Sequence, residues 1–73
     1  MCLGLPMRVV SGDDLMAVVE REGERRSVKM LLVGAQPEGT PVLVHLGSAV
    51  RVLDEDEARA IDEAIARITG ATP

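Results

Sequence analysis

Two side chains in this sequence have the chemistry to bind a metal or act as a nucleophile: the only cysteine, Cys2, and the only histidine, His45. A thiolate is a soft metal ligand and a nucleophile, and neutral imidazole is the commonest protein metal ligand. Because a closed zinc site uses four ligands, this pair predicts at most half a site, completed by a partner or by a metal that brings its own ligands. Two plainer readings stay open: free cysteines are often buried packing residues, and a strand histidine often only donates a hydrogen bond.

The residues that follow Cys2 are the third candidate. Gly and Pro interrupt this short apolar run and set the angle at which the thiol is presented. An exposed Leu and Met surface would bind a partner protein, whereas a buried one would be core for at least some of the residues. The predicted partner-binding segment is Cys2, Leu3, Gly4, Leu5, Pro6 and Met7.

The length and composition limit the chain to a single domain of 73 residues without Phe, Trp or Tyr. A core must therefore be built from Val, Leu, Ile, Met and Ala. One cysteine excludes an internal disulfide and fits a reducing compartment, most simply the cytoplasm. Arg8 and Pro6 interrupt the N-terminal apolar stretch, so we expect neither a signal peptide nor a membrane span.

The net charge of −4 lies entirely in the C-terminal part of the chain. Residues 1–53 carry six basic and six acidic side chains, while residues 54–73 carry two basic and six acidic ones. A nucleic-acid-binding protein normally has a basic surface, so this distribution argues against that class.

Short β-type runs separated by turn residues occupy the first 53 residues, which predicts a small barrel or sandwich. Val28, Met30 and Leu32 recur on one face of the third run, together with Arg26. GAQPEGT has the composition of a loop. The predicted strands are Leu5–Ser11, Leu15–Arg21, Arg25–Leu32, Pro41–Leu46 and Ala49–Leu53.

A helix is predicted over residues 54–69, where the apolar period changes to that of a helix. Asp54 and Glu57 have the spacing of a capping box. Two acidic–basic pairs, Glu55–Arg59 and Glu63–Arg67, have the favourable i,i+4 order. The predicted apolar stripe is Ala58, Ile61, Ala64, Ile65 and Ile68. Five strands and one helix predict a mainly β fold: a barrel over residues 1–53 and a C-terminal helix over 54–69.

The opening MCLGLP, with Arg8-Val9-Val10, resembles the N-terminal signature of the HypC/HupF family of nickel–iron hydrogenase maturation chaperones. Further along, VKMLLVG resembles the family's middle strand, and VLVHLG with Ala49 resembles its second motif. Residues 53–65 are similar to its helix, so the resemblance covers nearly the whole chain. Met7, where many members have Gly, is similar to the HupF-like branch or a HoxL-like paralogue, and Ser48 stands where many have an aromatic residue.

The resemblance implies an OB-like barrel and a non-enzymatic role in metallocentre assembly. It implies a HypD-like iron–sulfur partner and delivery of an Fe(CN)2CO group to the hydrogenase large-subunit precursor. In this role Cys2 and His45 would contact the iron, which is a transient cargo and not a permanent cofactor.

Three other classes of function make different demands on the sequence. A nucleic-acid-binding OB module stacks bases on aromatics along a basic groove, and this chain has no aromatics. A thiol enzyme or redox carrier would need a strongly lowered thiol pKa at Cys2, and no P-loop, C-x-x-C or dinucleotide motif is present. An adaptor paralogue would bind or protect the large subunit without itself holding iron.

Overall fold

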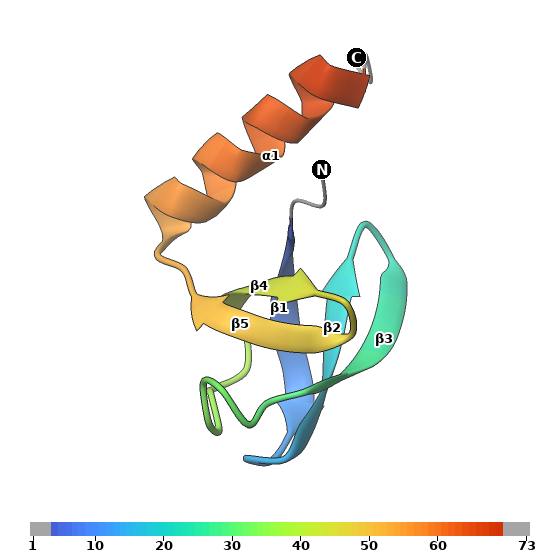
Figure 1. Cartoon of the computed structure of the whole chain (residues 1–73), viewed down its shortest axis with the longest axis vertical. Helices are drawn as coiled ribbons and strands as arrows, with labels where there is room; N and C mark the ends of the chain where they lie inside the picture. Colours follow the sequence, from blue (N-terminus) through green and yellow to red (C-terminus); the bar gives the residue numbers. More distant parts are fainter. Residues whose placement is uncertain (1–3, 70–73) are drawn as a thin grey trace.

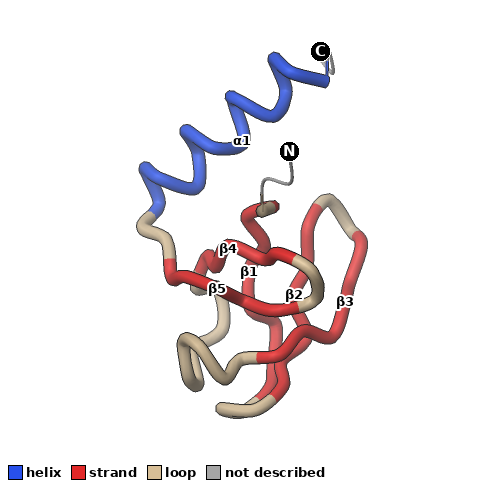
Figure 2. Tube along the Cα trace, viewed as in Figure 1, coloured by secondary structure: helices blue, strands red, loops and turns tan. Residues whose placement is uncertain are grey.

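The computed structural model describes residues 4–69, which form a five-stranded barrel followed by one helix (Figure 1; Figure 2). Around the barrel the order is β1-β2-β3-β5-β4, and β4 pairs with β1 to close it. Every pairing is antiparallel except that of β3 with β5. The elements are β1 Leu5–Gly12, β2 Met16–Arg21, β3 Glu24–Lys29, β4 Pro41–His45, β5 Ser48–Val52 and α1 Glu55–Thr69. The predicted mainly β fold, an OB-like barrel of five strands with one C-terminal helix, is confirmed.

One aliphatic core fills the barrel, because side chains alternate between the inner and outer faces of each strand. Val19, Met30 and Val42 have no exposed surface. β-branched residues suit the pleated inner surface, and methionine fills its irregular gaps. The core consists of Met7, Val9, Ala17, Val19, Val28, Met30, Val42, Val44 and Ala49.

The third strand ends earlier than the sequence pattern predicts. β3 stops at Lys29, and the carbonyl of Met30 accepts the backbone N–H groups of Val33 and Gly34. The chain therefore turns, and Leu32, predicted to share a face of the strand with Val28 and Met30, is 72% exposed while those two residues are buried. Arg26 lies two residues before Val28 but is exposed at the rim of the barrel. The prediction for Leu32 was wrong because periodicity alone does not reveal a turn closed by backbone hydrogen bonds.

The helix begins where the capping box predicts. The Asp54 carboxylate accepts the backbone N–H of Glu57 at 2.7 Å, and the Glu57 carboxylate accepts that of Asp54 at 3.1 Å. Figure 1 shows α1 leaving the barrel after β5 and extending beyond it. Of its predicted apolar stripe, Ala58 is buried, Ile61 and Ile65 are half-buried and Ala64 is exposed. Among the stripe residues whose side chains the structure describes, only Ala58, in the first turns of the helix, is fully buried; the side chain of Ile68 lies outside the described residues.

Ion pairs also join α1 to the barrel. Arg8 of β1 donates two hydrogen bonds to Glu55, at 2.6 and 2.8 Å. Arg51 of β5 lies 3.1 Å from Glu57. Glu55 is thus paired with the barrel and not with Arg59, which bonds Asp56 instead. Of the predicted i,i+4 pair, Arg59 contributes a weaker electrostatic attraction to Glu55, whereas Arg8 supplies the hydrogen bonds.

Candidate functional site

The start of β1 and the end of β4 lie side by side at one end of the barrel. Leu5 pairs with Val44, and His45 is the next and last residue of β4. Gly4 lies so close to β4 that a Cβ there would be 2.7 Å from Leu43 Cγ and 3.0 Å from the Val44 carbonyl oxygen. Only glycine fits this approach without a shift. The chain that follows Cys2 therefore enters the barrel against the strand that carries His45.

The predicted partner-binding segment is only partly exposed where the structure describes it. Cys2 and Leu3 lie outside the described residues. Leu5 is half-buried and packs against the core. Pro6 is buried, and Met7 is 3% exposed within the core. For Met7 the structure therefore favours the packing role that the sequence left open.

His45 lines an open cleft of about 310 Å³ at this end of the barrel. Its imidazole is half-buried, and no hydrogen bond to it occurs among residues 4–69. With no hydrogen-bond partner among these residues, an imidazole at an open cleft can accept an incoming ligand. The other lining residues are Leu5, Met7, Arg26, Ser27, Val28, Val44, Leu46 and Gly47.

A two-residue turn, Leu46-Gly47, follows His45 directly and joins β4 to β5. Both residues have positive φ, 52° and 79°. This is the pattern of the hairpin turns that match the twist of paired strands. His45 pairs with Ser48 across the turn, so a rigid hairpin end sets the position of the imidazole.

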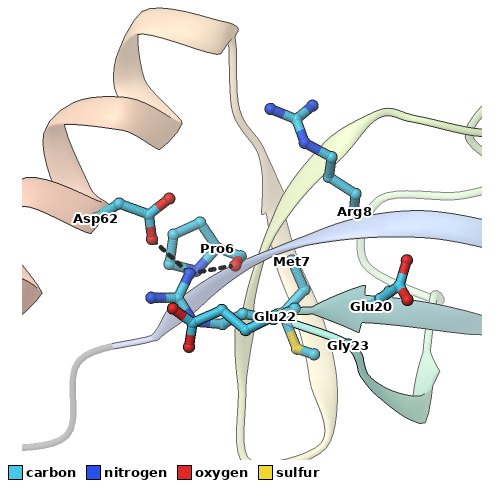
Figure 3. Close-up of a pocket in the computed structure, with 8 residues that line it drawn as sticks. Pro6, Met7, Arg8, Glu20, Glu22, Gly23 and Asp62 are labelled. Carbon is cyan, nitrogen blue, oxygen red and sulfur yellow. Dashed lines mark hydrogen bonds and ion pairs between the residues drawn. The ribbon is translucent and has the colours of Figure 1, made fainter.

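A second cleft, of about 500 Å³, lies between the barrel and α1 (Figure 3). One guanidinium nitrogen of Arg21 donates to both the Asp62 carboxylate of α1 and the Pro6 carbonyl of β1. Arg8, Glu20 and Glu22 also line this cleft. Among the described residues its lining includes neither His nor Cys, and Arg21 and Asp62 form an ion pair within it. The sequence pattern missed this contact because Arg21 and Asp62 are far apart in the chain and neither motif nor period links them.

Two carboxylates have pKa values set by specific hydrogen bonds. The Arg8 guanidinium lowers the pKa of Glu55, and Glu55 in turn raises the pKa of Arg8. The backbone N–H groups of Met16 and Leu15 lower the pKa of Asp13 at the β1–β2 turn. Both effects belong to the architecture, since neither carboxylate lines the cleft at His45.

The described part of the chain cannot enclose a metal by itself. Within residues 4–69, no three His, Cys, Asp or Glu side chains are grouped to hold an ion. In the same residues, no helix is long and apolar enough to cross a bilayer. A metal at His45 would need ligands from Cys2, from a partner or from its own bound groups.

Comparison with known proteins defines the class of protein to which this barrel belongs. The model of the HupF/HypC family matches residues 1–65. The hydrogenase expression/formation protein HupF of Rhizobium leguminosarum bv. viciae is 56% identical over 71 residues, which are 97% of this chain and 72% of that protein. The chain belongs to the HupF/HypC family, as the opening motif and the V-H-x-G motif predicted.

Two further relatives are also named for a role in making hydrogenase. The hydrogenase maturation factor HybG of Escherichia coli K12 is 40% identical in an alignment 75 residues long, including gaps. The alignment covers 89% of this chain and 88% of that protein. The hydrogenase maturation factor HypC of the same strain is 37% identical in an alignment 79 residues long, including gaps. This alignment covers 100% of this chain and 88% of that protein. These relatives are hydrogenase maturation factors.

Proposed function

We propose that this protein is a non-enzymatic hydrogenase maturation chaperone that carries an Fe(CN)2CO group together with a HypD-like iron–sulfur partner. It would then deliver this group to the hydrogenase large-subunit precursor in the cytoplasm. Cys2 and His45 would be its two contacts with the iron. The names of the relatives support the maturation role, and the single thiol suits a reducing compartment.

The observation that carries this proposal is the pairing of β1 with β4. The register places Leu5 opposite Val44, which immediately precedes His45. Leu5 is three positions after Cys2, and even a fully extended chain spans at most about 11 Å over that distance. The covalent chain therefore keeps Cys2 within reach of the cleft that His45 lines.

The coordination chemistry agrees with two protein ligands. The two cyanides and one carbon monoxide already occupy three of the iron's coordination positions, so the cargo needs few donors from the chaperone. A thiolate and an imidazole are donors that iron accepts. Because two contacts hold less tightly than a closed four-ligand site, this arrangement suits a carrier that must release its load.

The test is anaerobic co-purification with the partner from a hydrogenase-producing host, read by infrared absorption in the cyanide and carbonyl region. Wild type should carry the diatomic bands. Cys2→Ser keeps the size of the side chain but loses the soft sulfur donor, and His45→Ala removes the imidazole; both should lose the bands. Ser48→Ala, at the cross-strand neighbour of His45, is the matched control and should keep them.

The outcomes separate a carrier from an adaptor. If wild type captures the partner without diatomic bands, it is an adaptor that binds or protects the large subunit, and the iron-carrying role is wrong. If His45→Ala retains both the partner and the bands, His45 is not an iron contact and the site reduces to Cys2 with partner ligands.

A further inference from the structure

The start of β1 is paired with β4 but lies beyond the end of β2. Pro6 pairs with Leu43 of β4. On the other side, the pairing of β1 with β2 begins two residues later, at Arg8 with Glu20. Continuing that register would place Pro6 opposite Glu22, which lies in the turn between β2 and β3. The second strand has therefore already turned where β1 begins.

The Arg21 side chain contacts β1 at this point. Arg21 is the last residue of β2, and one of its guanidinium nitrogens donates to the Pro6 carbonyl at 3.0 Å (Figure 3). The same nitrogen donates to the Asp62 carboxylate of α1. Because both bonds share one nitrogen, the position of Asp62 affects the direction from which Arg21 meets Pro6. The start of β1 is thus connected to α1 through the Arg21 side chain.

Burial distinguishes the Arg21 ion pair from the pairs that Arg8 and Arg51 form with α1. The Arg21 side chain is 19% exposed, whereas those of Arg8 and Arg51 are 51% and 56% exposed. Exposed pairs contribute little to stability, but a guanidinium largely removed from water is destabilising when its partner is lost. Arg8 also donates to a backbone carbonyl, that of Gly39, which lies in the loop before β4.

Two other carboxylates line the same cleft and compete for the guanidinium. These are Glu20 and Glu22. Of the two, Glu20 lies 3.7 Å from Arg25. The Asp62 carboxylate is the acceptor that holds Arg21 beside Pro6. Neutralising Asp62 would leave the competing carboxylates as the stronger acceptors and draw the guanidinium away from β1.

We propose that Arg21 is a positioning residue, through which α1 fixes the start of β1 and the direction in which the chain runs toward Cys2. This inference rests on the proposed function, because Cys2, four positions before Pro6, is the proposed iron contact. A segment held in its binding direction loses less conformational freedom when it binds. The helix would therefore contribute to iron retention by holding the segment that presents the thiol.

The first experiment measures amide hydrogen exchange by NMR on the isolated protein. The Leu5 amide should exchange about tenfold faster in Arg21→Met and in Asp62→Asn, because a hydrogen bond from a charged donor no longer holds the next residue. The lysine ammonium can donate to both acceptors, so Arg21→Lys should stay within about threefold of wild type. Arg51→Met removes an ion pair between α1 and β5 and is the matched control, which should leave Leu5 exchange unchanged.

The amides of the barrel core separate positioning from general stability. If Arg21 only stabilises the fold, Arg21→Met should speed the exchange of Val19, Val42 and Leu5 by the same factor. If Arg21 positions the start of β1, the increase should be confined to Leu5. A uniform increase, or an unchanged Leu5 in both Arg21→Met and Asp62→Asn, would overturn the proposal.

The second experiment measures iron retention in the same variants by anaerobic co-purification and infrared absorption. The diatomic bands per captured partner should weaken by up to about tenfold in Arg21→Met and Asp62→Asn, because a smaller fraction of the protein is competent to bind. Arg21→Lys and Arg51→Met should keep them. Unchanged bands in all variants would show that Arg21 does not position the thiol. If wild type carries no bands, the proposed function is wrong, while Leu5 exchange still decides whether Arg21 fixes the start of β1.

Discussion

Replacing Gly4 with alanine should destabilise the end of the barrel that carries His45. The new Cβ would lie 2.7 Å from Leu43 Cγ, 3.0 Å from Leu43 Cδ1 and 3.0 Å from the Val44 carbonyl oxygen. Contacts this short force a neighbour to move, and overpacking typically costs about 1–3 kcal/mol. For a domain of this size that corresponds to a fall in Tm of about 6–20 °C. Thermal unfolding followed by circular dichroism measures it directly.

A double mutant shows whether the close approach is the cause. Leu43→Ala removes two of the three nearest atoms and leaves only the backbone oxygen at 3.0 Å. Gly4→Ala combined with Leu43→Ala should therefore cost about 1 kcal/mol less than the sum of the single changes. The same proteins should capture the iron–sulfur partner less well when the segment after Cys2 is displaced. Strict additivity, with an unchanged Tm for Gly4→Ala, would refute the reasoning.

Three further outcomes are expected. Met30→Ala should destabilise the fold by about 2–5 kcal/mol in urea denaturation, because Met30 is fully buried; a smaller loss would mean that the core collapses around the cavity. Asp54→Ala should cost about 1 kcal/mol and reduce helical circular dichroism, because the cap of Glu57 is lost; Asp54→Asn, which still accepts that bond, is the control. Acidification should loosen the attachment of α1 to the barrel. The Glu55 pKa is lowered from 4.5 in the folded state by Arg8, so the stabilisation is present above pH 4.5 and lost as pH falls below it. The carboxyl chemical shift of Glu55 measures this titration by NMR. Glu55→Gln, which cannot ionise, should abolish the pH dependence of the contact. A Glu55 carboxyl that titrates at pH 4.5 in the folded protein would contradict the predicted lowering of its pKa.

The attachment of α1 shows why its polar residues need a tertiary explanation. Propensity and spacing place Glu55 beside Arg59 on an isolated helix. In the fold, Arg8 presents a planar guanidinium to the same carboxylate in a two-bond arrangement, which is geometrically more specific. Arg21 similarly joins α1 to β1 through Asp62 and the Pro6 carbonyl.

Local patterns in the sequence determined most of the elements of this protein. Two-residue period, Val-rich runs and Gly-containing turns predicted the five strands, and an Asp-x-x-Glu cap predicted where the helix begins. The motifs MCLGLP and V-H-x-G identified the family. These features depend on residues that are close together in the chain, so the sequence pattern is enough to predict them.

The tertiary structure alone decided which distant residues meet. The barrel closes through β1 and β4, and this pairing places the chain before Leu5 against the strand that ends at His45. It also buries Met7, which the sequence assigned to a partner surface as well. These outcomes depend on packing and backbone hydrogen bonds between segments far apart in the chain, which residue spacing does not encode. Leu32 differs, because a local turn closed on the Met30 carbonyl exposes it although its spacing matched that of Val28 and Met30.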